Sequence, residues 1–454
     1  MFRKIIKNYC GNKKFDFGNF VPYTTDMIDF DFYTKILKKE LVPAMGCTEP
    51  IAIAYATAKA KSLVAEDATH VVINCSGNII KNVKAVTVPH SGGQKGIEMA
   101  ATLGVISGDA SKMLEVIADA TDDDRARAIE KVKEKFCDVN LVEGVSNLYI
   151  DAIVETDHHK ARAVLEGSHT NITLLQLDEK ILFEKKCETQ TNDVSFDLNK
   201  MKLNDILTYA NEVPLDDVRQ LLENQIEKNT KIAQEGLDNA WGACIGKTIL
   251  EEWGSDVKSC AIAKAAAGSD ARMSGCPLPV VINSGSGNQG ITVTLPVTEY
   301  ANAWKVSDEK KLRALIVSNL VSIYIKHYIG PLSAFCGAVS AASGAGAAIT
   351  FMSGGDYAHI ARTITNTLAN VGGIVCDGAK PSCAAKIASS VHAAILAHCM
   401  SESDKQFNAG EGLVESDVEE TIKNIGYIGK VGMKETDTEI LNVMIDKVDV
   451  DSCL

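Results

Sequence analysis

The pattern of hydrophobic and polar residues differs between the two halves of this chain. In the first half, residues 69–78 and 81–89 are β-branched runs broken by Ser-Gly-Asn, which predicts a hairpin. Short alternating segments typical of an antiparallel sheet follow at residues 141–156, 160–169, 170–178 and 179–186. Helical composition is found at residues 32–41, 50–63, 96–103 and 110–136. The first half is therefore predicted to be a mixed domain with antiparallel strands.

Beyond residue 199 nearly every segment has helical composition, including the long stretch 215–253. Loops rich in Gly, Ser and Pro interrupt the helices at residues 275–290, 327–337, 352–357 and 371–383. Because a rigid scaffold can present functional groups on loops, we expect the site in these loops. The predicted fold class is α+β. Its predicted parts are a disordered extension at residues 1–31, an α+β domain at 32–199 and a mainly helical domain at 200–454.

One segment without Lys, Arg, Asp or Glu lies between Lys326 and Asp356, and its length would permit a membrane span. Its second half consists largely of Gly, Ala and Ser, which contribute little transfer free energy to lipid but let helices approach closely. We therefore predict a buried helix. The uncharged run at residues 387–401 is interpreted in the same way, so no membrane partner is expected.

Composition narrows the class of partner and the compartment. The formal net charge of -13 argues against nucleic acid and anionic membranes, since both attract basic patches. A small molecule is the expected partner. The 13 cysteines lack the dense, even spacing of a secreted disulfide framework, which favours a reducing cytoplasm.

Three cysteines near the C-terminus have the most informative spacing. Cys376 follows Cys336 by 40 residues, and Cys383 follows by seven more, in surroundings rich in Gly, Ala and Ser. Thiolates are the ligands of iron–sulfur clusters, and three of them would leave one iron of a cubane cluster open to a substrate. Zinc is the competing metal, although its usual tight C-x2-C pairs do not occur in the sequence. Cysteines that are simply buried in the core are the third interpretation.

Cys47 and Glu49 are candidate bases. Cys47 precedes the helix expected to begin near Pro50, and the positive end of that helix is predicted to lower the thiol pKa. Glu49 is the alternative base if burial raises its pKa. Purely structural roles are the competing interpretation for both residues, because Gly-Cys can turn the chain and acidic residues are favoured at a helix start.

Two glycine-rich loops, at residues 91–96 and 283–290, are candidates for binding an anion through backbone N–H groups. Such loops also serve turns alone, so the signal is weak. The side chains expected to assist binding are Ser91, Lys95, Asn283 and Ser284. Next to the cysteines, Asp377 and Lys380 are expected to orient the thiolates.

Three segments that contain these residues resemble motifs of the L-cysteine desulfidases, relatives of the iron–sulfur L-serine dehydratase alpha chain. They are VPAMGCTEPIAIA at 42–54, VTVPHSGGQKG at 86–96 and VCDGAKPSCAAK at 375–386. The resemblance extends from about Phe32 to about Met444, and the tail with Cys453 has no counterpart. It implies a 4Fe-4S cluster held by Cys336, Cys376 and Cys383, with Cys47 as proton acceptor.

The resemblance implies a carbon–sulfur lyase that converts L-cysteine to hydrogen sulfide, pyruvate and ammonia by β-elimination. Soft sulfur on iron is a favourable match, so an open iron would bind the substrate thiolate. The same cluster acting on a hydroxyl leaving group would make the chain an L-serine or L-threonine dehydratase. A redox sensor, from a different class, would normally complete its cluster with a fourth thiolate. A homo-oligomer is compatible with each function.

Overall fold

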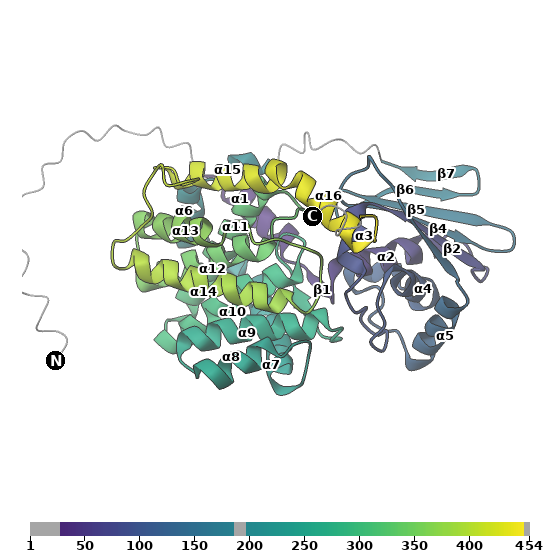
Figure 1. Cartoon of the computed structure of the whole chain (residues 1–454), viewed down its shortest axis with the longest axis horizontal. Helices are drawn as coiled ribbons and strands as arrows, with labels where there is room; N and C mark the ends of the chain where they lie inside the picture. The colour runs from purple at the N-terminus through teal and green to yellow at the C-terminus, as the bar shows by residue number, and fades with distance from the viewer. Residues whose placement is uncertain (1–27, 186–196, 449–454) are drawn as a thin grey trace, which may run out of the picture.

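The computed structural model describes residues 28–185 and 197–448. Most of the predicted N-terminal extension, and the tail with Cys453, lie outside the described residues. Figure 1 shows a helical part on one side and a sheet with its own helices on the other. The predicted α+β class is confirmed.

The sheet has six strands in the order β3-β2-β4-β5-β6-β7. Strand β2 is parallel to β3 and antiparallel to β4, and the remaining neighbours are antiparallel. The antiparallel ladder expected from the alternating segments is thus confirmed. The strand bounds are His70–Cys75 (β2), Cys137–Leu141 (β3), Tyr149–Glu155 (β4), Lys160–Glu166 (β5), Ile172–Leu177 (β6) and Lys180–Glu184 (β7).

The predicted hairpin at residues 69–89 is wrong. Its first half forms β2, but the second half begins with helix α3 (Gly77–Val83), with Ser76 at the N-cap. The physical reason is that β2 is a central strand, already paired on both edges with β3 and β4. The β-branched residues that suggested a strand, Val83, Val86 and Val88, are buried in the core instead.

Helices of the first half pack beside this sheet. Helix α2 contacts β4 and β5, and α4 contacts β2 and β3. The predicted helix at residues 110–136 is two elements, because the chain turns before the capping box formed by Thr121 and Asp124. The bounds are Phe30–Glu40 (α1), Thr48–Lys61 (α2), Ile97–Ser107 (α4), Ala110–Glu115 (3-10 helix η3) and Asp122–Lys133 (α5).

The second half is helical, as predicted. The expected long helix at residues 215–253 is divided, because Cys244 adopts a left-handed conformation between α7 and α8. The bounds are Leu198–Lys200 (η5), Leu203–Glu212 (α6), Leu215–Asp217 (η6), Arg219–Asp238 (α7), Ile245–Trp253 (α8), Val257–Met273 (α9), Gly287–Trp304 (α10), Asp308–Ile329 (α11), Gly337–Ser353 (α12), Tyr357–Val371 (α13), Cys383–Ser401 (α14), Val418–Tyr427 (α15), Ile428–Gly432 (π-helix η7) and Lys434–Met444 (α16).

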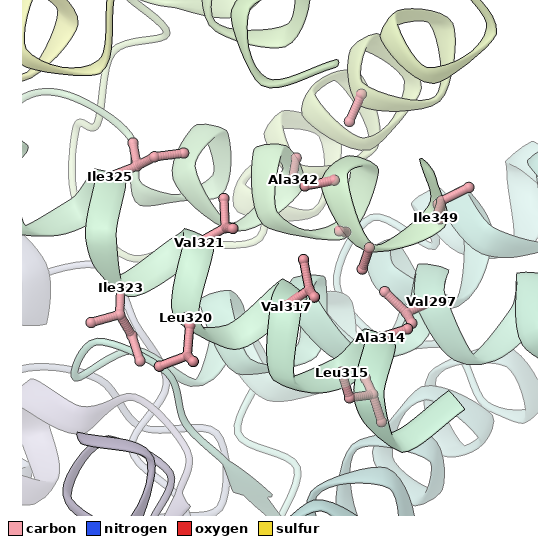
Figure 2. Packing of buried hydrophobic residues seen from close by; sticks show 14 of the residues in the cluster. Val297, Ala314, Leu315, Val317, Leu320, Val321, Ile323, Ile325, Ala342 and Ile349 are labelled. Carbon is pink, nitrogen blue, oxygen red and sulfur yellow. The ribbon is translucent and has the colours of Figure 1, made fainter. Parts of the chain in front are cut away.

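Helices α11 and α12 form the centre of the helical part. Figure 2 shows buried aliphatic side chains of the two helices, with Val297 of α10 nearby, and all of them belong to one hydrophobic core. Nearly all of α12 is buried, which confirms the interpretation of the uncharged segment as a core helix. By length and composition α14 is apolar enough to cross a membrane, but 56% of that stretch is buried in the protein, as in core helices that pass the same test.

The chain crosses between the two parts more than once. Helix α1 contributes to the hydrophobic core of the helical part. Strand β1 (Pro43–Met45) then pairs with β8 (Pro279–Val281), and α16 returns from the helical part to pack on α3. These crossings bring the start of α2 next to loops of the helical part. The domain boundary at residue 199 remains a prediction.

Candidate functional site

A cavity of 480 Å³ lies where the two parts meet. It is lined by the start of α2, the β5–β6 loop, the end of α9, the loop before α10 and the segments that carry three cysteines. Six of the residues selected from sequence line it: Cys47, Glu49, Ser284, Cys336, Cys376 and Cys383.

The three cysteines, called the cysteine end below, come from two adjoining segments. Cys336 caps the N-terminus of α12, and Cys383 begins α14. The N–H of Cys336 donates to the Ile374 carbonyl at 2.9 Å, and the N–H of Cys376 donates to the Ala334 carbonyl at 2.6 Å. Burial, and then the neighbouring Cys376, raise the pKa of Cys336 to about 12. Cys336 is therefore a protonated thiol at neutral pH unless a ligand displaces its proton.

Spacing of the cysteines bears on the kind of metal. Within the described residues, no three His, Cys, Asp or Glu side chains gather closely enough to surround one ion. The ligands of a mononuclear zinc site all bind the same ion. In a cubane cluster each cysteine binds a different iron, and coordination deprotonates the thiol.

Lysines surround the cysteine end. Lys326, Lys380 and Lys386 all lie close enough to act electrostatically on its thiols. The Lys326 ammonium donates to the Gly330 carbonyl at 2.5 Å, and burial lowers its pKa to about 8. Such cations would offset the negative charge of thiolates bound to a cluster.

Asp377 forms ion pairs within the segment between the second and third cysteines and with the first turn of α14. Its carboxylate pairs with Lys380 at 2.5 Å and also with Lys386. Burial opposes ionisation, but the hydrogen bonds from the two lysines prevail and lower the pKa of Asp377 to about 2. The side chains expected to orient the thiolates thus hold the backbone of this loop.

Cys47 and Glu49 form a hydrogen-bonded pair that also lines the cavity. Cys47 caps α2 and is buried, and its thiol donates to Glu49 Oε2 at 3.0 Å. Burial, and then the charge of Glu49, raise the pKa of Cys47 well above its usual value. The predicted lowering of this pKa by the helix is therefore wrong, because a buried thiol beside a carboxylate resists ionisation.

The condition set for Glu49, a pKa raised by burial, is not met. Burial opposes its ionisation, but nearby His169 and the Cys47 thiol outweigh burial and lower the pKa of Glu49 to about 2. The resting pair is thus a protonated thiol and a carboxylate. In this pair the Glu49 carboxylate can take up a proton directly, whereas Cys47 could do so only after passing its own proton to Glu49.

Two further residues in the cavity, His169 and Arg272, were missed by the sequence analysis. His169 lies on the β5–β6 loop, with Nε2 at 3.8 Å from Glu49 Oε1. Arg272 lies at the end of α9. An arginine in the small-residue stretch KAAAGSDARM was a usable signal, whereas the sequence around His169 has no distinguishing pattern. Cys47, Glu49, His169 and Arg272 are called the base end below.

The four residues expected to bind a carboxylate are placed differently from one another. Ser284 lines the cavity, and its hydroxyl donates to Asn283 Oδ1 at 2.9 Å. Asn283 is buried and its amide donates to Asn319, so it organises the loop. Ser91 is buried against the Gln94 carbonyl and Lys95 is exposed, and both lie away from the cavity.

The loop that carries Ser91 and Lys95 packs against Gly46, the residue before Cys47, through Pro89. Gly46 has a φ of +58°, and a Cβ there would lie 2.1 Å from the Pro89 side chain. A side chain at position 46 would be strained and would collide with Pro89. The GCTEP motif and the loop at residues 86–96 are therefore packed together, and the loop has a structural role next to the site.

Comparison with known proteins gives one family. The model described as "Serine dehydratase alpha chain" matches residues 111–442. A protein of Lachnoclostridium phytofermentans named "UPF0597 protein" is 50% identical over 411 residues, covering 90% of this chain and 98% of its own. Proteins of the same name from Finegoldia magna and Treponema denticola are 48% and 44% identical, covering 91% of this chain in each case and 99% and 97% of their own length. These names state no substrate.

Proposed function

This chain belongs to the serine dehydratase alpha chain family, and from that premise we propose that it is an iron–sulfur lyase that releases hydrogen sulfide from L-cysteine. Membership in the family indicates a dehydratase-like lyase. The cysteine substrate and the 4Fe-4S cluster are the proposed refinements. The proposal places the enzyme in the reducing cytoplasm, and the described cysteines are all free.

One observation carries the proposal: a single cavity joins the cysteine end to the Cys47–Glu49 pair. Cys336, Cys376 and Cys383 would hold the cluster through three of its irons. When bound, the cluster supplies a Lewis acid whose open iron polarises the leaving group. No pyridoxal phosphate is needed in this scheme.

The residues of the chain perform the proton transfer. The α-proton of L-cysteine passes to the base end, the electrons of the C–H bond form a Cα–Cβ double bond, and the Cβ–S bond breaks. Sulfide leaves, and the aminoacrylate takes up water to give pyruvate and ammonia. With Glu49 as base the proton moves in one step. With Cys47 as base the thiol first transfers its proton to Glu49 over the 3.0 Å hydrogen bond.

L-Serine dehydratase is the second candidate function, favoured by the description of the matching family. The two reactions differ only in the atom that leaves, and iron binds both oxygen and sulfur. The match between soft sulfur and iron favours cysteine, as does the resemblance of the GCTEP and CDGAK segments to the desulfidases.

The deciding experiment uses the full chain purified without oxygen. Sulfide and pyruvate are measured with L-cysteine, and pyruvate with L-serine, at matched concentrations. We expect equimolar sulfide and pyruvate from L-cysteine, with a higher kcat/KM than for L-serine. Pyruvate from L-serine alone would identify a dehydratase, and turnover of neither amino acid would leave the sensor function.

A further inference from the structure

Arg272 is a buried cation at the wall of the cavity. It is 2% exposed, and the carboxylates at residues 28–185 and 197–448 form no ion pair with it. Its Nε atom is also buried and has no hydrogen-bond partner among these described residues. A buried charge is costly unless it is paired, and arginine cannot shed its proton in a protein. Its partner is therefore expected to be an anion that enters the cavity, which Arg272 lines.

Space for the guanidinium is made by a glycine. A Cβ at Gly287 would lie 2.2 Å from Arg272 Nε and 2.7 Å from Cζ. Gly287 is also the first residue of α10, an 18-residue helix whose N-cap residue, Ser286, lines the cavity. The first N–H groups of a helix have no partner within it, and this end is electropositive. The Ser286 side chain accepts from the Gln289 N–H, so the N–H groups of Gly287 and Asn288 are the remaining donors for an anion next to Arg272.

The position of Arg272 relative to the base indicates which anion binds. Its positive charge acts on the Cys47 thiol. Cys47 belongs to a small buried cluster with Val86 and Met273, the next residue after Arg272, and Cys383 of the cysteine end packs against this cluster. The cavity wall therefore leads from Arg272 past the cluster that contains Cys47 to the cysteine end. An α-amino acid has its carboxylate, α-carbon and β-substituent in the same order, and the arginine fork matches a carboxylate.

We propose that Arg272, with the N-terminus of α10, binds the α-carboxylate of the amino-acid substrate. This inference rests on the proposed function in taking an amino acid as the ligand, but not on its cleavage. Asn288 lines the same cavity with a buried Oδ1 atom that lacks a partner, which provides an acceptor for the α-ammonium group.

The other buried cation among the described lining residues is Lys326. Its ammonium already donates to the Gly330 carbonyl and lies beside Cys336 and Cys376. It belongs to the cysteine end, where the substrate's β-substituent is expected. Arg272 is therefore assigned to the carboxylate.

The test measures binding of L-alanine and L-alaninamide to the holoenzyme by titration calorimetry. L-Alanine keeps the carboxylate but has no leaving group, so binding is separated from turnover. We expect L-alanine to bind the unmodified protein about 100-fold more tightly than the neutral amide, because charge-assisted hydrogen bonds are lost with the amide. In Arg272→Gln the two ligands should bind within about threefold of each other. Arg272→Lys keeps the positive charge but loses the planar guanidinium that binds a carboxylate with two hydrogen bonds. Its ratio of L-alanine to L-alaninamide affinity should therefore be intermediate.

Arg313→Gln is the matched control. Arg313 is partly buried and donates to the Ala210 carbonyl, but it pairs with Glu309 and lies away from the cavity. This variant should lower Tm and leave the alanine-to-alaninamide ratio unchanged. Arg272→Gln should show the opposite behaviour, with Tm unchanged or raised, because it removes an unpaired buried charge.

Equal binding of L-alanine and L-alaninamide to the unmodified protein, or no measurable binding of L-alanine, would overturn the assignment. So would an unchanged ratio in folded Arg272→Gln. If that variant does not fold, Gly287→Ala replaces it, since the added Cβ must displace the guanidinium and should lower the ratio. Sulfide release from L-cysteine is scored separately, so either proposal can fail while the other stands.

Discussion

The thiols at the cysteine end and the thiol at the base end of the cavity have different charged neighbours. Burial raises the pKa of Cys336 and Cys383, and neighbouring lysines act against burial there. At Cys47 the Glu49 carboxylate adds to the effect of burial and outweighs the opposite effect of Arg272, so the thiol stays protonated. The cysteines that line this cavity thus have different surroundings. In the proposed function the three cysteines hold metal and the Cys47–Glu49 pair holds a proton.

The largest expected effect comes from breaking the cysteine end. Cys336→Ala, Cys376→Ala and Cys383→Ala should each lose the broad visible absorbance of a 4Fe-4S protein and fall to background turnover. Iron content and sulfide release are measured together under anaerobic conditions. Cys399→Ala, at an exposed position of α14, is the matched control and should keep both. A variant at the cysteine end with four irons and normal turnover would remove that residue from the ligand set.

Substitutions at the base end should lower turnover without lowering the iron content. Glu49→Gln removes the proton acceptor in both versions of the mechanism, so turnover should fall at least about 100-fold while iron is retained. Cys47→Ser should fall similarly if Cys47 is the base, because a hydroxyl is far weaker. Full activity of Cys47→Ser beside an inactive Glu49→Gln would assign the base role to Glu49. Loss of iron from Cys47→Ser would move Cys47 to the cysteine end.

The low pKa of Glu49 predicts a smaller effect, on stability. Folding lowers the pKa of Glu49 from 4.5 to about 2. The ionised carboxylate therefore stabilises the folded protein, and this contribution is fully present at pH values above 4.5. That stabilisation is lost as the pH falls toward 2. Between pH 5 and pH 3.5 the metal-free protein should lose about 1 kcal/mol more than Glu49→Gln. Urea unfolding of both proteins measures it, and parallel pH profiles would show that Glu49 is not ionised more readily in the folded state.

The smallest effect is expected at the loop behind Cys47. Lys95→Gln changes an exposed side chain away from the cavity, so kcat/KM for L-cysteine should change by less than about twofold. Ser284→Ala, at the cavity wall, is the comparison variant and should alter KM more. A large rise in KM for Lys95→Gln would restore the carboxylate role predicted from sequence.

Local patterns were sufficient for much of the fold. The antiparallel ladder at β4 to β7 and the buried α12 followed from residue type and periodicity. The hairpin at residues 69–89 did not, because a strand pattern shows β-branched burial without showing which edges are already paired. Val83, Val86 and Val88 satisfy the same pattern by packing in the core.

The candidate site also contains residues that the sequence indicated and residues that only the structure revealed. Spacing drew attention to Cys336, Cys376 and Cys383 because they lie on neighbouring segments of one part of the chain. By itself the sequence thus determined the α+β class, the helical second half and the residue types available for a cluster. Only the tertiary structure decided that His169 and Arg272 join Cys47 in the cavity, since they come from the β5–β6 loop and α9. It also decided the pKa directions of Cys47 and Glu49, because burial and a partner's charge depend on neighbours that the folded chain brings together.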